Sequence, residues 1–168
     1  LALMDDAWWT PVTQYPGADS GWVLLMEKSL PGGIFVDRDG ERYMNEAAPY
    51  GDVVKAMYTH HAKTGRAVPG YMIFDARYRR YHLAGPVAHG IAMPDSALPR
   101  KLRASFLVKA PSIDALAARL EMLPERLAAT IARFVGDGAR TLLARTARID
   151  EASAVTILQA WLDREGGA

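Results

Sequence analysis

The chain has 168 residues, of which 50% are hydrophobic and 23% are charged, an ordinary composition for one globular domain. Twenty basic and nineteen acidic residues nearly cancel, so no overall field attracts nucleic acid or an anionic membrane. Its apolar runs are far shorter than the roughly 20 residues of a membrane-spanning helix, and the absence of cysteine excludes a disulfide framework, a thiolate metal site and a catalytic cysteine and fits a cytoplasmic protein.

Residues 1–20 carry two adjacent tryptophans, Trp8 and Trp9, followed by prolines and a glycine that interrupt regular structure. The first residue is Leu1 rather than an initiator methionine, and this opening is typical of the interior of a longer protein. Two interpretations of the tryptophan pair stay open. The rings pack locally in the core, or they pack against a part of the protein outside this chain.

Two strands and a hairpin are predicted next. Residues 21–28 are expected to form a buried strand, because an apolar run lies between turn residues. Residues 34–37 and 41–44 are expected to pair with each other as a hairpin. The loop between them places Gly40 where a positive φ is expected.

A helix is predicted over residues 51–63, where apolar residues recur at three- and four-residue spacing. Asp52 suits the positive end of its dipole, and Gly65 is expected to end it. Residues 71–74 form a second short apolar strand. Asp75 is expected to cap the short helix that follows.

Residues 83–104 contain prolines and glycines with little periodicity, which predicts a long loop with one helical turn near Ser96. Another strand is expected over residues 106–109. Ser112 caps one helix and Pro124 opens the next. From residue 139 onward the sequence is helix-permissive.

Short strands followed by helices, without alternating strand–helix units, predict an α+β fold with a small antiparallel sheet. The chain contains neither the glycine-rich fingerprint of a dinucleotide-binding loop nor a phosphate-binding P-loop. A nucleotide cofactor would therefore be bound through residues outside this sequence.

Three stretches carry a resemblance to a known family: residues 4–9, 27–34 and 40–50. They are similar to the FAD-dependent 3-ketosteroid dehydrogenases, members of the fumarate reductase and succinate dehydrogenase flavoprotein superfamily. The similarity covers roughly residues 3–135, and the segment from Asn45 to Tyr50 is its most specific part.

The resemblance implies a division of the chain into three parts. Residues 1–20 are expected to be a linking arm from an FAD-binding domain that this chain lacks. Residues 21–135 are expected to be the substrate-binding, or catalytic, domain, and residues 136–168 an atypical helical tail. The chain is thus expected to be a truncated flavoenzyme that by itself binds no FAD and is inactive.

The resemblance also assigns chemistry to Tyr50. In the ketosteroid dehydrogenases, a tyrosine at this place takes a proton from C2 of the steroid A ring, while the flavin takes hydride from C1. A phenol with a pKa near 10 is a weak base, but polarising the 3-keto group acidifies the neighbouring C–H. The alternative for Tyr50 is a half-buried tyrosine whose hydroxyl is hydrogen-bonded nearby. A Δ1 and a Δ4-(5α) dehydrogenase are equally compatible with the motif.

Residues next to Tyr50 are expected to contact the substrate: Met44, Asn45, Glu46 and Pro49. For Asn45 and Glu46 the alternative is capping of the helix backbone. Residues 47–50 contain no arginine, which argues against a dicarboxylate substrate and favours an uncharged, steroid-like one. The histidines lack metal-ligand spacing, so no metal is expected. The alternative function is a non-catalytic domain that binds an apolar ligand or a partner chain.

Overall fold

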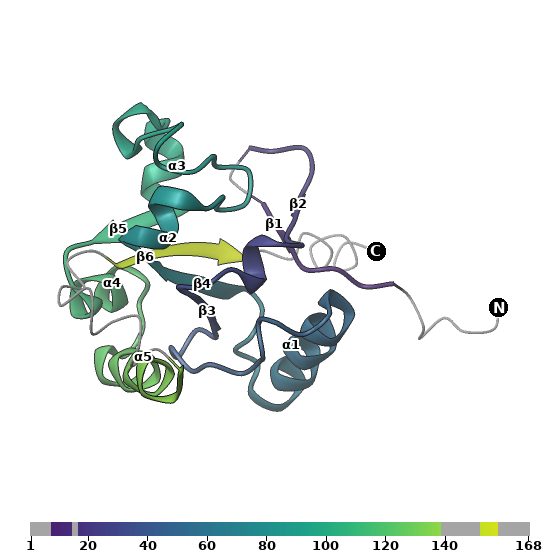
Figure 1. The fold of residues 1–168 in the computed structure, drawn as a ribbon. Helices are drawn as coiled ribbons and strands as arrows, with labels where there is room; N and C mark the ends of the chain where they lie inside the picture. Colours follow the sequence, from purple (N-terminus) through teal and green to yellow (C-terminus); the bar gives the residue numbers. More distant parts are fainter. Residues whose placement is uncertain (1–7, 15–16, 139–151, 158–168) are drawn as a thin grey trace.

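The computed structural model describes residues 8–14, 17–138 and 152–157, with the backbone alone for 135–138 and 152–157 (Figure 1). Its centre is a four-stranded antiparallel sheet in the order β3-β4-β6-β5. These strands are β3 (Gly33–Val36), β4 (Gly70–Asp75), β6 (Ala152–Ile157) and β5 (Leu107–Ala110). Strands β1 (Val12–Thr13) and β2 (Trp22–Val23) form a separate antiparallel pair. The predicted α+β class with a small antiparallel sheet is confirmed.

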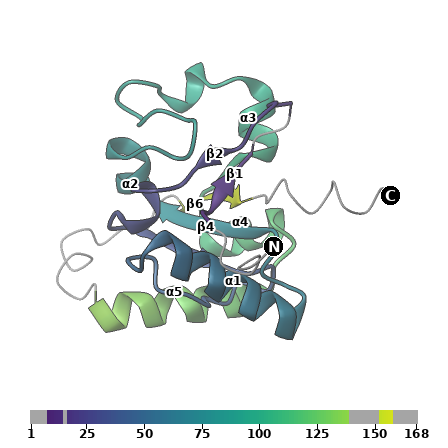
Figure 2. The same ribbon diagram turned by 90° about the vertical axis from the view of Figure 1, so that its right-hand side faces the viewer.

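Helices cover the sheet on both faces (Figures 1 and 2). The α-helices are α1 (Tyr50–Thr64), α2 (Ala76–Tyr81), α3 (Arg100–Ser105), α4 (Ile113–Arg119) and α5 (Pro124–Gly138). Two 3₁₀ turns, η1 (Glu27–Ser29) and η2 (Asp95–Ala97), lie in the connections. No helix in the described part of the chain has both the length and the apolar character to cross a bilayer.

The sheet separates two cores, because successive residues of a strand point to opposite faces. Phe35 and Met72 pair across β3 and β4 and belong to one core, which also takes in residues of α1 and α2. Ile34 and Ile73 pair in the next register position and face the other core, which α4 and α5 cover. All four residues of β3 are buried, so this strand supports both layers.

The predicted helix ends are confirmed. Gly65 ends α1 with φ of 68° and donates its N–H to the carbonyl of His61. Asp75 caps α2 by accepting a hydrogen bond from the N–H of Tyr78 at 2.7 Å, and Ser112 caps α4. Local capping chemistry is encoded within a few residues, which is why it could be predicted.

The predicted hairpin over residues 34–44 forms only at its turn, where the N–H of Asp37 donates to the carbonyl of Glu41 at 3.0 Å. The N–H of Phe35 instead donates to the carboxylate of Glu46 at 2.9 Å. A side chain thus takes the place of a partner strand. Gly40 does turn with a positive φ of 82°, as predicted.

The buried strand predicted over residues 21–28 is also wrong. Only residues 22–23 are extended, and Leu25 and Met26 are 50% and 74% exposed. The charged pair Glu27 and Lys28 is buried instead. The reason is local: the turn η1 directs these two side chains inward, where they find polar partners.

Two further differences concern the later chain. The loop predicted over residues 83–104 does contain the turn η2 near Ser96, but it also contains helix α3. Within the predicted helical tail, residues 152–157 form β6, which fills the place between β4 and β5. This segment contains Val155, Thr156 and Ile157, whose branched side chains favour strands. The remainder of the tail after α5 lies outside the described residues.

Candidate functional site

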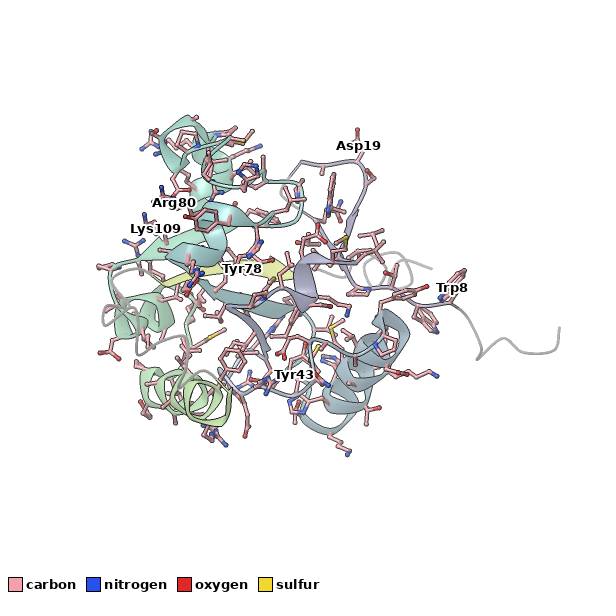
Figure 3. The ribbon with its side chains drawn as sticks, in the orientation of Figure 1. Trp8, Asp19, Tyr43, Tyr78, Arg80 and Lys109 are labelled. Carbon is pink, nitrogen blue, oxygen red and sulfur yellow. The ribbon has the colours of Figure 1, made fainter. Side chains whose placement is uncertain are left out.

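Tyr50 lies at the first position of α1, after a short segment that we call the Tyr50 loop (residues 45–49). Its side chain is half-buried, and its ring centroid lies 5.9 Å from that of Trp8. Trp8 is 85% exposed and lies at the outer side of the molecule beside α1 (Figure 3). The Tyr50 hydroxyl has no hydrogen bond to another described residue. The phenol is thus at the surface rather than in packed interior.

The predicted substrate contacts separate into two groups. Asn45 and Pro49 are exposed beside Tyr50, whereas Met44 and Glu46 are buried. The side-chain oxygen of Asn45 accepts the N–H of Ala47 at 3.1 Å, which stabilises the turn of the Tyr50 loop. Neither Asn45 nor Glu46 caps α1, because its N-cap is Pro49, without a side-chain cap. The capping alternative is therefore wrong.

Glu46 fixes the Tyr50 loop from inside the protein. Its carboxylate accepts the backbone N–H of Phe35 and forms a two-pronged ion pair with Arg42, with Nε 3.0 Å from Oε1 and Nη2 2.5 Å from Oε2. Such forked, charge-assisted contacts hold both orientation and distance. Glu46 joins the loop to β3, and its carboxylate is fully engaged there.

Sequence reasoning missed a partly buried polar cluster made by Asp37, Tyr43 and His60. The carboxylate of Asp37 is 2% exposed and lies 2.8 Å from Nε2 of His60, on α1. The ring of Tyr43 stacks on that imidazole, and its hydroxyl is buried with no hydrogen-bond partner among the described residues. Burial raises the pKa of Tyr43, and the nearby Asp37 and Glu46 carboxylates raise it further.

One signal for this cluster was present in the sequence. Asp37 directly follows the apolar strand, where a buried carboxylate needs partners. His60, late in α1, also suits the negative end of the helix dipole. Its real partner is 23 residues away, so local spacing could not identify the pair. Within the described ranges, no group of three or more His, Cys, Asp or Glu could hold a metal ion.

The described residues do not include the usual phosphate-binding turn of a dinucleotide site. Phosphate groups are usually held where a glycine-rich turn joins a strand to a helix. Here β4 meets α2 through Asp75, and β5 meets α4 through Pro111 and Ser112. No described strand enters a helix through a glycine-rich turn. This face presents the half-buried phenol of Tyr50 beside the exposed ring of Trp8.

Comparison with known proteins identifies the family of the chain. The profile of the family described as FAD binding domain matches residues 1–154. The 3-oxosteroid 1-dehydrogenase of Mycobacterium tuberculosis (strain ATCC 25618 / H37Rv) is 36% identical over 140 residues, which are 80% of this chain and 23% of that protein. The chain therefore spans about a quarter of the length of such relatives.

Solved structures show the same relationship. The 3-ketosteroid Δ1-dehydrogenase from Sterolibacterium denitrificans, determined with 1,4-androstadiene-3,17-dione, is 25% identical with a TM-score of 0.76. That match covers 90% of this chain and 31% of the other. A flavocytochrome c3 fumarate reductase, 17% identical with a TM-score of 0.59, shares the fold over 89% of this chain and 24% of its own. The predicted resemblance is confirmed.

Proposed function

Since the chain belongs to the FAD binding domain family, we propose that it forms the substrate-facing part of an FAD-dependent 3-ketosteroid dehydrogenase. In this proposal the Tyr50 hydroxyl oxygen accepts the proton removed from the steroid A ring. The single observation that carries it is the position of Tyr50, which begins α1 as a half-buried side chain with its ring 5.9 Å from that of Trp8.

In this proposal the chain binds the substrate and removes a proton from it. Desaturation of a ketosteroid removes a proton from the carbon beside the ketone and a hydride from the next carbon. FAD, the cofactor of the family, supplies the oxidising capacity when bound. Δ1 and Δ4-(5α) dehydrogenation remain alternatives within the proposal.

An uncharged substrate is favoured by the charges around the Tyr50 loop. The guanidinium of Arg42 faces Glu46, and the ammonium of Lys28 faces backbone carbonyls of the loop. Neither is therefore available to clamp a carboxylate of a dicarboxylate substrate. The exposed side chains of Trp8 and Met26 instead offer apolar surface.

The test is dye-coupled oxidation of a 3-ketosteroid by the purified, FAD-loaded protein that carries this chain. We expect Tyr50→Phe to lower kcat by about 100-fold or more, because a positioned general base contributes about that much. The control is Tyr81→Phe on α2, where the ring is 52% exposed. Wild-type turnover by Tyr50→Phe would overturn the role of Tyr50.

The alternative is a non-catalytic domain that binds an apolar ligand or a partner chain. It predicts steroid binding, followed by a change in intrinsic tryptophan fluorescence, with no dye reduction by the FAD-loaded protein. The same preparation separates the two functions, because binding and turnover are measured on one sample.

A further inference from the structure

A buried ammonium group lies directly beneath the Tyr50 loop. Lys28 is 3% exposed, and its Nζ donates to the carbonyl oxygens of Ala48 at 2.6 Å and Glu46 at 3.0 Å. It also donates to Oγ of Ser29 at 3.1 Å, and this hydroxyl donates in turn to the Glu46 carbonyl at 3.2 Å. The contacts join η1 to a loop 18 to 20 residues further along the chain.

These contacts lie immediately before Tyr50. Ala48 is followed by Pro49, whose ring fixes φ and whose carbonyl accepts the first N–H groups of α1, those of Asp52 and Val53. Holding the Ala48 carbonyl therefore holds the start of α1. The N–H of Ala48 bonds only within the loop, to the carbonyl of Asn45 at 3.1 Å. Lys28 is thus a principal tie between the loop and the body of the protein.

We propose that Lys28 is the positioning residue for Tyr50. Its ammonium fixes the carbonyls of residues 46 and 48, and so sets the place from which the Tyr50 hydroxyl meets the substrate. This inference rests on the proposed function of Tyr50. It assigns to Lys28 no contact with the substrate.

A purely stabilising role fits Lys28 less well. Burying an ammonium is unfavourable, and an apolar side chain of similar length is often at least as stabilising at such a place. Consistent with this, burial lowers the pKa of Lys28, although the Glu46 carboxylate opposes the shift. What methionine could not supply is a set of hydrogen bonds that point the loop carbonyls in one direction.

The test compares Lys28→Met with Lys63→Met, which removes an exposed lysine near the end of α1, the helix that Tyr50 begins. In the FAD-loaded protein, we expect Lys28→Met to speed amide hydrogen exchange over residues 46–52 by about 10-fold while exchange in β4 stays unchanged. We expect kcat for a 3-ketosteroid to fall about 10- to 100-fold with KM within about 3-fold, because misplacing a reacting group mainly affects turnover. Lys63→Met should change neither.

Lys28→Arg is the second variant and retains the charge. Its guanidinium can still donate to the loop carbonyls, so smaller changes of the same kind are expected. Unchanged exchange over residues 46–52 in Lys28→Met, equal acceleration throughout the chain, or failure of Lys28→Met to fold would each overturn the inference. Full kcat in Lys28→Met with an inactive Tyr50→Phe would overturn the inference alone. Full kcat in Tyr50→Phe would instead overturn the proposed function.

Discussion

The rings of Tyr43 and His60 are stacked, with centroids 4.9 Å apart and planes inclined by 8°. Nε2 of the same imidazole lies 2.8 Å from Oδ2 of Asp37. One face of His60 therefore meets an aromatic ring and one edge meets a carboxylate. Together these contacts join α1 to the turn that follows β3, and they hold the helix that begins at Tyr50 against the sheet.

Removing the Tyr43 hydroxyl should not weaken the fold. This oxygen is buried without a hydrogen-bond partner among the described residues, so Tyr43→Phe deletes an unsatisfied polar atom and keeps the stacked ring. We expect the free energy of unfolding to stay the same or rise by up to about 1 kcal/mol. Urea denaturation followed by circular dichroism measures it.

Tyr78 provides the matched comparison. Its hydroxyl donates to the carbonyls of Glu27 at 2.7 Å and Leu83 at 3.1 Å, so Tyr78→Phe leaves two buried acceptors without this donor. We expect a loss of about 1–3 kcal/mol. An equal loss in Tyr43→Phe and Tyr78→Phe would contradict the assignment of an unsatisfied hydroxyl at Tyr43.

Alkaline pH should destabilise the protein. Burial raises the pKa of Tyr43 and of Tyr78, with further increases from neighbouring carboxylates, so above pH 10 the folded state keeps protons that the unfolded chain has released. Stability therefore falls as pH rises above 10, by about 1.4 kcal/mol per pH unit for each such group. Lys28 acts in the opposite sense, since its lowered pKa makes stability rise with pH until the unfolded lysine loses its proton near 10.5.

Unfolding free energies at pH 9.0, 10.5 and 11.5 separate these contributions. We expect a decline between pH 10.5 and 11.5, where only the tyrosine effect remains, and a smaller decline in Tyr43→Phe. A stability that is flat to pH 11.5 in the wild type would show that neither phenol is held neutral by the fold.

Replacing the Asp37 carboxylate with an amide should destabilise the protein less than removing the group altogether. Oδ1 accepts the N–H groups of Asp39 and Glu41, each at 2.9 Å, and Oδ2 faces His60. In Asp37→Asn the remaining oxygen can accept both N–H groups, and the new NH₂ can donate to neutral imidazole. We expect a loss of about 1 kcal/mol for Asp37→Asn and about 2–4 kcal/mol for Asp37→Ala, measured by urea denaturation. Equal losses would mean that the imidazole contact dominates.

Elements with local signals could be predicted from the sequence. Helix α1 follows from its apolar spacing and from Gly65, and the caps at Asp75 and Ser112 each bond to a residue three positions away. The motif that ends at Tyr50 indicated the family, because several residue types in a fixed order are a more specific signal than hydrophobic periodicity.

Long-range pairings could not be predicted in this way. The ammonium of Lys28 is buried because carbonyls from another segment receive it, and the Glu46 carboxylate replaces the expected partner of β3. A charged residue in a turn is ordinarily assigned to solvent. Strand β6 joins the sheet from far along the chain, between β4 and β5, and nothing in the local composition indicates that place.

Substitution of Gly40 should separate backbone strain from a steric contact. Gly40 has φ of 82°, and a Cβ placed there would lie 3.2 Å from the backbone N of Leu127 in α5. Gly65 has a similar φ of 68° but would meet nothing within 4 Å. Alanine at either position must adopt a left-handed conformation, which costs about 1–2 kcal/mol. Only at Gly40 must the turn also move away from α5, at an additional 1–3 kcal/mol, roughly.

We therefore expect Gly65→Ala to lose about 1–2 kcal/mol of unfolding free energy and Gly40→Ala to lose about 2–5 kcal/mol, both measured by urea denaturation. Amide exchange should further show loosened contacts over residues 124–130 in Gly40→Ala alone, since α5 begins there. Equal losses in the two variants would mean that the turn yields freely and that Gly40 is required only for its φ. A larger loss in Gly40→Ala would instead identify the contact with Leu127 as the point where the turn after β3 and α5 fix each other.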